Sequence, residues 1–172
     1  NAAETARQAL EVNERYVPAH VILASLAVSN ENYGVAVREA EAALAVDSGS
    51  IDALAVLGAT HYLAGNRAGF EDARRRAMAR NGRSAEFHAT LAELAARNRL
   101  YREAMEFARE GVALDSTSWR TLGVLGMNQL RLGEIEAGRR SLERAFEGDP
   151  YDIWIKNTLD LLDTMADYRE TK

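Results

Sequence analysis

Large apolar and small side chains return along this chain every 34 residues, and the spacing never slips. One set of equivalent positions holds Leu23, Leu57, Leu91, Leu125 and Leu159. The position after it holds the small residues Ala24, Gly58, Ala92 and Gly126. Two more mostly small sets are Ala2, Ala36, Phe70, Ala104 and Gly138, and Ala9, Ala43, Ala77, Gly111 and Ala145. Helices approach closely only where facing side chains are small, so the pattern predicts helical hairpins that stack to bury their apolar faces.

Each 34-residue unit contains two kinds of break. Just before an apolar stretch stand the N-cap residues Ser50, Ser84, Ser118 and Asp152. Midway through each unit lie Asn30-Glu31-Asn32, Gly65-Asn66, Asn98-Arg99 and Gly133-Glu134. The Gly and Asn residues in these segments tolerate the left-handed conformation that ends a helix. The chain therefore reads as one array: a half unit over 1-16, full units over 17-50, 51-84, 85-118 and 119-152, and a terminal helix over 153-168.

The unit that begins at Trp119 resembles the tetratricopeptide repeat family most closely, with Leu125-Gly126, Gly133, Ala145 and Pro150 at the matching positions. The second unit adds Leu57-Gly58, His61-Tyr62, Gly65 and Ala77. Phe70 and Arg74 depart from the small residues of the family. The resemblance covers nearly the whole chain and implies an all-α fold, a right-handed α-α superhelix of about ten helices.

The same resemblance implies a concave groove, lined by the first helix of each unit, that receives a peptide segment. The matching positions are Val21, Ser25, Val28, Ala55, Ala59, Tyr62, Ala89, Glu93, Ala96, Arg97, Gly123, Met127, Leu130 and Arg131. We expect an apolar groove in which Tyr62, Met127 and Leu130 anchor an apolar or amphipathic segment. In the alternative interpretation these three side chains only pack against neighbouring helices.

Chaperone-adaptor members of the family grip a terminal carboxylate with a clamp of Lys, Asn and Arg. The corresponding positions hold Val21, Ala55, Ala89 and Gly123, whose side chains donate no hydrogen bond. We therefore expect no binding of acidic chaperone tails.

The terminal helix carries two apolar stripes, although one is enough to pack on the preceding hairpin. The additional stripe consists of Trp154, Leu161 and Met165. It predicts an end interface for self-association or for a downstream domain, and the alternative is a capping helix with some exposed apolar surface. Pro150-Tyr151-Asp152 and the segment 157-163 also resemble the junction at which a bacterial repeat array leads into a gluzincin-like metallopeptidase domain. No His-Glu-x-x-His zinc motif occurs in this chain.

One basic cluster, Arg74, Arg75, Arg76 and Arg80, lies on a predicted second helix. It is either a docking patch for an acidic partner or a solvated face with local ion pairs. The formal charge of -5 gives no support to nucleic-acid binding, and cysteine is absent. The sequence contains no run of 18 apolar residues, so it predicts no membrane span.

The histidines His20, His61 and His88 have no metal-clamp spacing, and no phosphate loop or nucleophile motif is present. The sequence therefore predicts no enzyme activity, cofactor or metal. The leading function is a protein-binding scaffold, and the alternative is an accessory region of a larger enzyme whose catalytic domain lies outside these 172 residues. Because the chain starts at Asn1, we expect a fragment, which leaves the compartment open.

Overall fold

The computed structural model describes the backbone of residues 1–170 and the side chains through residue 165. The described residues form ten helices and no strand. Their bounds are α1 Ala2–Val12, α2 Val17–Ser29, α3 Tyr33–Val46, α4 Ile51–Leu63, α5 Arg67–Arg80, α6 Ala85–Arg97, α7 Tyr101–Leu114, α8 Trp119–Arg131, α9 Ile135–Gly148 and α10 Ile153–Glu170. The all-α prediction is confirmed.

Side-chain caps mark the start of α4, α8 and α10. The hydroxyl of Ser50 accepts a hydrogen bond from the Ala53 amide at 3.3 Å, and Ser118 does the same for Thr121 at 3.4 Å. The Asp152 carboxylate accepts from the first amides of α10 at 2.9 and 3.1 Å. Ser84 precedes α6, but its side chain makes no capping bond, so the prediction of a side-chain cap was wrong there.

The turn inside each hairpin needs one residue in the left-handed region. The positive φ angles of the described chain fall at Glu31 (57°), Gly65 (72°), Arg99 (64°) and Gly133 (83°), each 34 residues after the last. Glycine adopts this conformation without strain, whereas a residue with a Cβ pays about 1 kcal/mol. The fold thus imposes one backbone conformation on four equivalent positions, and only two of them carry glycine.

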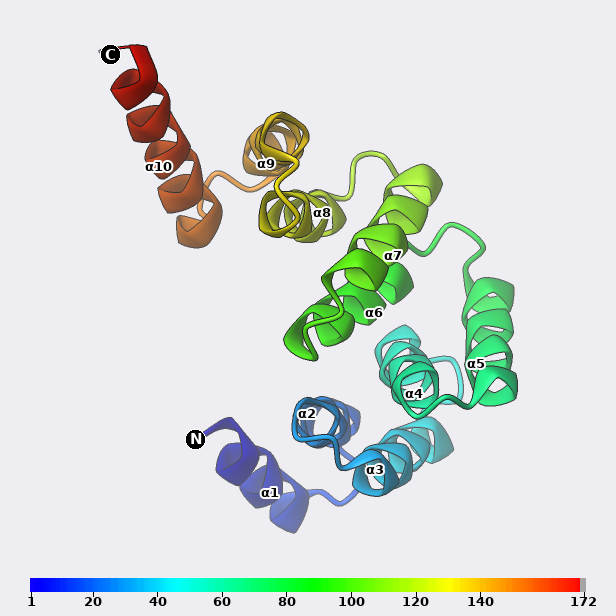
Figure 1. Ribbon diagram of the computed structural model, residues 1–172. Coiled ribbons are helices and arrows are strands. Elements are labelled where there is room, and N and C mark those ends of the chain that lie inside the picture. The colour runs from blue at the N-terminus through cyan, green and yellow to red at the C-terminus, as the bar shows by residue number, and fades with distance from the viewer. Residues whose placement is uncertain (171–172) are drawn as a thin grey trace.

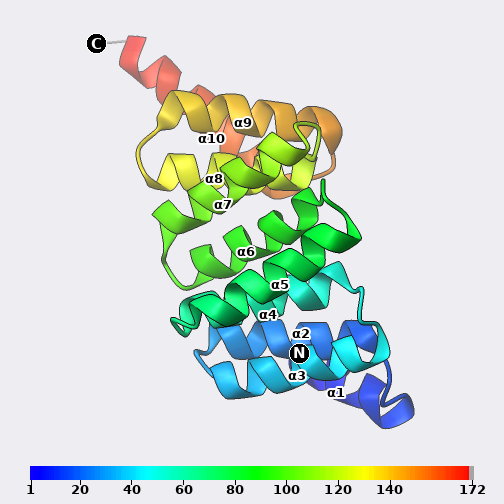
Figure 2. The same ribbon diagram turned by 90° about the vertical axis from the view of Figure 1, so that its right-hand side faces the viewer.

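The hairpins stack into a curved two-layered array. In Figure 1 the helices α2, α4, α6 and α8 lie on the inner side of the curve, and α3, α5, α7 and α9 lie outside. Figure 2 shows the hairpins stacked one above another from α2 and α3 up to α8 and α9. The predicted α-α superhelix is confirmed, and its inner layer presents a concave surface.

Small residues let the two helices of a hairpin touch. A Cβ on Gly126 would lie 2.9 Å from the Gly138 carbonyl oxygen, closer than packing allows. Where the sequence departs from this pattern, larger side chains fill the space. Phe70 is buried and stacks edge-on with Tyr62 (ring centroids 5.5 Å apart), and Tyr62 stacks in the same way with Phe107 (5.0 Å). Aromatic packing between α4, α5 and α7 therefore replaces the close helix crossing.

Candidate functional site: the concave surface

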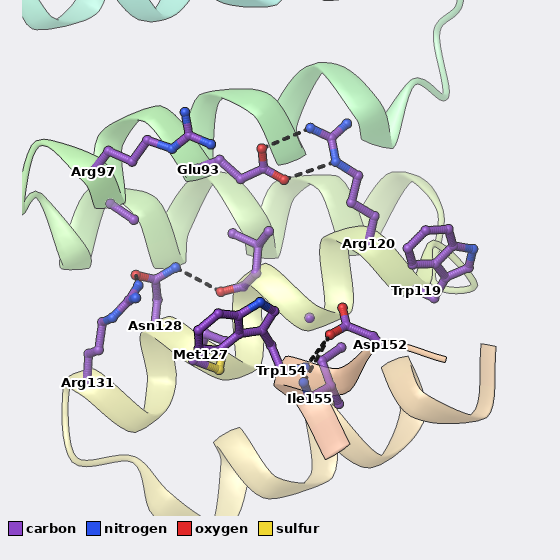
Figure 3. A pocket seen from close by; sticks show the side chains of 13 residues that line it. Glu93, Arg97, Trp119, Arg120, Met127, Asn128, Arg131, Asp152, Trp154 and Ile155 are labelled. Carbon is purple, nitrogen blue, oxygen red and sulfur yellow. Dashed lines mark hydrogen bonds and ion pairs between the residues drawn. The ribbon is translucent and has the colours of Figure 1, made fainter. Parts of the chain in front are cut away.

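The concave surface contains two hollows that share a ridge. The C-terminal hollow, of about 490 Å³, lies between α6, α8 and the start of α10 (Figure 3). The N-terminal hollow, of about 260 Å³, lies between α2, α4 and α6. Glu93, Arg97 and Arg120 border both hollows. The two hollows therefore form one groove with a charged ridge across its middle.

The ridge is built around Arg120 of α8. Its Nε and Nη2 each donate to a different carboxylate oxygen of Glu93 at 3.0 Å, and Nη2 also donates to the Thr90 hydroxyl at 3.2 Å. Nη1 pairs with Glu86, on the first turn of α6. Burial opposes the charged form of Arg120, but the bonds and charges of Glu93 and Glu86 outweigh it and raise the pKa of the guanidinium. The network ties two consecutive hairpins together across the groove.

A second arginine, Arg131 at the end of α8, is held in place without a carboxylate. Its guanidinium carbon lies 5.3 Å from the centroid of the Tyr101 ring, in a cation–π arrangement. Its Nη1 donates to the amide oxygen of Asn128 at 3.3 Å. Asn128 is only 1% exposed and is fixed in turn by a 2.8 Å bond to the Val124 carbonyl oxygen. A buried polar side chain thus orients a cation at the edge of the C-terminal hollow.

Apolar side chains form the other part of the C-terminal hollow. Trp119 and Met127 come from α8, and Trp154 comes from the first turn of α10 (Figure 3). Trp154 is 82% exposed, which is unusual for so large an apolar side chain. The repeat places Trp154 at the position of Arg120, Leu161 at that of Met127 and Met165 at that of Arg131. The stripe predicted as an end interface therefore occupies groove-facing positions of α10, and Leu161 and Met165 are 59% and 50% exposed.

The structure places the predicted groove residues in three environments. Eight of them line the hollows: Val21, Ser25, Glu93, Ala96, Arg97, Gly123, Met127 and Arg131. Four are buried in the core and expose no side chain to a ligand: Val28, Ala55, Ala59 and Ala89. The inner helices pack against one another along the face that carries these four, because the array curves tightly enough for α2 to contact α6 as well as α4.

The remaining two, Tyr62 and Leu130, are packing residues. Tyr62 belongs to the aromatic cluster with Phe70 and Phe107. Burial raises the pKa of its hydroxyl, and the charge of Glu103 adds to the effect. Leu130 packs against the cluster of Leu142 and Ile155, with Gly138 beside it. Tyr62 and Leu130 line neither hollow, so their role as ligand anchors stays a prediction, and Met127 is the one proposed anchor that lines a hollow.

Sequence reasoning missed several residues of the groove, among them Trp119, Arg120 and Asn128. A signal for Arg120 was present, since it stands 34 residues after Glu86 and 34 before Trp154. Opposite charges at equivalent positions of consecutive units predict an ion pair between adjacent inner helices. The buried Asn128 had no comparable signal, because a polar residue on a helix usually faces solvent.

The basic cluster lies on α5, in the outer layer, and is largely engaged in ion pairs. Arg75 and Arg76 both pair with Asp72 on the same helix. Arg74 pairs with Glu110 of α7 at 3.2 Å. The Arg80 side chain lies close to Gly49, at the end of the preceding hairpin. A docking role for these arginines stays a prediction, and their charge is partly neutralised locally.

Other kinds of site receive no support within the described part of the chain. No group of three or more His, Asp or Glu side chains there is placed to hold a metal ion. No helix there is long and apolar enough to cross a bilayer.

Comparison with known proteins identifies the fold. No family profile and no curated protein matches the sequence. Among solved structures, TTC0263, a thermophilic TPR protein of Thermus thermophilus, is similar with a TM-score of 0.61 and 16% identity over 93% of this chain and 88% of that one. YrrB, described as a TPR protein with an unusual peptide-binding site, has a TM-score of 0.51 and 17% identity over 98% and 87%.

Yeast Tom70 is similar with a TM-score of 0.67 and 16% identity, over 96% of this chain and 36% of that one. At such identities the likeness establishes the architecture alone. The chain therefore has the fold of a tetratricopeptide repeat solenoid. These comparisons leave the resemblance of the C-terminal segment to metallopeptidase junctions as a prediction.

Proposed function

We propose that this chain is a protein-interaction scaffold that holds a polypeptide segment along its concave groove, with an apolar part of that segment in the C-terminal hollow. The observation that carries the proposal is the position of Trp154. It is a large apolar side chain, 82% exposed, at a groove-facing position and beside Met127 and Trp119. Exposed aromatic and methionine side chains around a hollow are typical of protein-binding surfaces.

The groove is not apolar along its whole length. The ridge of Arg120, Glu86 and Glu93 divides it, so we assign the apolar contacts to the C-terminal end alone. The positions of the chaperone clamp hold Val21, Ala55, Ala89 and Gly123, which offer no side-chain donor to a terminal carboxylate. We therefore propose an internal segment as the ligand, rather than a carboxylate tail.

The test is a selection of peptides from a random 12-residue display library against the purified chain, followed by titration of the winners. Both tryptophans of the chain line the C-terminal hollow, so the intrinsic tryptophan fluorescence reports on this site directly. We expect the winners to shift this fluorescence. We also expect Trp154→Ala combined with Met127→Ala to weaken binding at least tenfold, a typical loss when a buried anchor is removed.

The matched control is Tyr151→Ala. Tyr151 is as exposed as Trp154, at 89%, but stands in the loop before α10 and does not line the hollow. The control variant should bind like the wild type. A library that yields no binder, or winners that bind the Trp154→Ala and Met127→Ala variant as well as the wild type, would refute the proposal.

Two alternatives give the same apolar stripe a different occupant. In the accessory-region alternative it is a neighbouring domain of a larger enzyme, and in a self-assembling module it is a second copy of the chain. The exposure of Leu161 and Met165 is the observation that favours it. Light scattering separates self-association from a monomer. A gene that encodes a zinc-binding helix after Lys172 would favour the metallopeptidase version.

A further inference from the structure

The C-terminal hollow places two unlike chemistries side by side. Figure 3 shows Arg97 and Arg131 at one end of it and Trp119 at the other, with Trp154 between them. We propose that this hollow recognises a segment that presents a bulky apolar side chain next to a side-chain carboxylate, with the carboxylate bound between Arg97 and Arg131. This inference rests on the proposed function and specifies the chemistry of its partner.

The charges around the C-terminal hollow favour an anionic ligand. Three arginines and two carboxylates line the hollow, although the whole chain carries a formal charge of -5. Both carboxylates are already engaged. Glu93 is bound through its two oxygens by Arg120, and Asp152 accepts from the first amides of α10. Among the described side chains, Arg97 and Arg131 have no carboxylate partner, so the hollow offers two cations to an incoming anion.

Arg131 is preorganised to bind an anion. Arg131 is held by the Tyr101 ring and by Asn128, so its guanidinium loses little freedom when it binds an anion. Arg97 occupies the equivalent position one unit earlier, on the adjacent inner helix. Equivalent positions on neighbouring helices of a solenoid lie side by side. Both guanidinium groups border the same hollow, so a carboxylate placed between them is attracted by both.

The third arginine of the hollow, Arg120, is already engaged in ion pairs. Arg120 borders both hollows, is neutralised by Glu93 and Glu86, and also donates to the Thr90 hydroxyl. An anion gains little from a guanidinium that already has two carboxylates. The N-terminal hollow therefore offers an anion only Arg97, which borders both hollows, whereas the C-terminal hollow combines Arg97 and Arg131 with exposed apolar side chains. A ligand that contacts both the arginines and the apolar side chains needs its acidic and apolar groups close together in sequence, or on one face of a helix.

The experiment compares selections on two proteins. The variant carries Arg97→Gln and Arg131→Gln, and both side chains are exposed, so the fold should be retained. The control carries Arg38→Gln and Arg140→Gln, two exposed arginines of the outer helices α3 and α9. We expect winners on the wild type and the control to be enriched in Asp or Glu beside Leu, Phe, Ile or Met. Winners on the groove variant should keep the apolar residues and lose the acidic enrichment.

The quantitative readout uses one tryptophan-free winner and its twin with glutamine in place of each acidic residue. On the wild type the acidic peptide should bind about tenfold tighter than the twin, as one charge-assisted contact with two guanidinium groups predicts. The preference should fall to less than twofold on the groove variant, and to a similar extent when salt is raised to 1 M. The control should keep the full preference.

The outcomes separate the two proposals. If no peptide is selected, the proposed function fails. If peptides bind in the hollow but acidic and amide twins bind equally, or the groove variant keeps the preference, the further inference fails alone. If winners place the carboxylate at their C-terminus and lose binding when it is amidated, a terminal anion is recognised and the inference is likewise wrong. If the wild type dimerises through Trp154 in the absence of peptide, a second copy occupies the hollow and both proposals fail.

Discussion

Removing Arg120 should weaken the contact between the α6–α7 and α8–α9 hairpins and leave the contacts between the other hairpins intact. Arg120→Ala takes away four hydrogen bonds to side chains of α6 and leaves Glu93 without its bidentate partner. Each partner of the Arg120–Glu93 pair is 31% exposed, which lies between a surface pair and a buried one. A surface pair contributes about 0–1 kcal/mol, and breaking a buried one costs about 3–5 kcal/mol. We therefore expect a loss of about 2 kcal/mol.

Arg109→Ala is the matched control, because Arg109 also bridges two hairpins, from α7 to Glu134 at the start of α9. The two side chains of the Arg109–Glu134 pair are more exposed, at 43% and 39%. The expected loss of folding free energy is therefore about 0.5 kcal/mol. Urea denaturation followed by circular dichroism measures both losses. Hydrogen exchange then localises them, since each hairpin of a solenoid contacts only its neighbours. Protection should fall in α6 and in α8 through α10 and stay unchanged in α1 through α3.

A double-mutant cycle of Arg120→Ala and Glu93→Ala gives the coupling between the two side chains. We expect at least about 1 kcal/mol, because the two groups make a bidentate contact in a partly buried place. A coupling below about 0.3 kcal/mol would refute the reasoning, and so would an Arg120→Ala loss no larger than that of Arg109→Ala. Either result would mean that water replaces the carboxylate contacts at no cost.

Three more predictions follow from packing, turns and titration. Gly126→Ala should destabilise the chain by about 1–3 kcal/mol in urea denaturation, because its Cβ would clash with Leu142 and the Gly138 backbone, whereas Gly34→Ala meets nothing within 4 Å and should stay within about 0.5 kcal/mol. Gly133→Ala should cost about 1 kcal/mol and Arg99→Gly should raise the melting temperature slightly, since both positions have positive φ. Burial lowers the pKa of His88 despite Glu110 nearby, so its imidazole is neutral in the folded protein at pH 7. Its contribution to stability should be complete above about pH 6.5 and decline as the pH falls below that value, and denaturation curves of His88→Gln should lack this decline.

The fold was predictable because the repeat supplies many independent observations of each position. A single glycine such as Gly65 would be weak support for a turn. Four equivalent positions that all follow an apolar stretch, at residues 31, 65, 99 and 133, make the turn certain even where Glu31 and Arg99 replace glycine. Local capping and small-residue crossings agree with this period at nearly every unit, and such agreement across levels is what specifies one structure.

The groove was only partly predictable, because the family positions assume an average curvature. In this chain the inner helices pack so closely that Ala55 and Ala89 are covered by their neighbours. Phe70, which replaces a small residue, draws Tyr62 toward the outer layer. The exposure of a groove position therefore depends on the packing of adjacent units, and no single unit of the sequence encodes it.

Because ion pairs join successive units on both sides of the array, its curvature should depend on the salt concentration. On the outer side, Arg74–Glu110 and Arg109–Glu134 draw α5, α7 and α9 together, and on the inner side Arg120 draws α8 toward α6. The outer pairs are more exposed than the Arg120–Glu93 pair, so dissolved ions weaken them first. Rising ionic strength should then let the outer helices move apart while the Arg120–Glu93 pair holds α8 to α6. The curvature of the array should therefore increase. Small-angle X-ray scattering at two salt concentrations would detect the change as a smaller radius of gyration, and the span available to a bound segment would shrink with it.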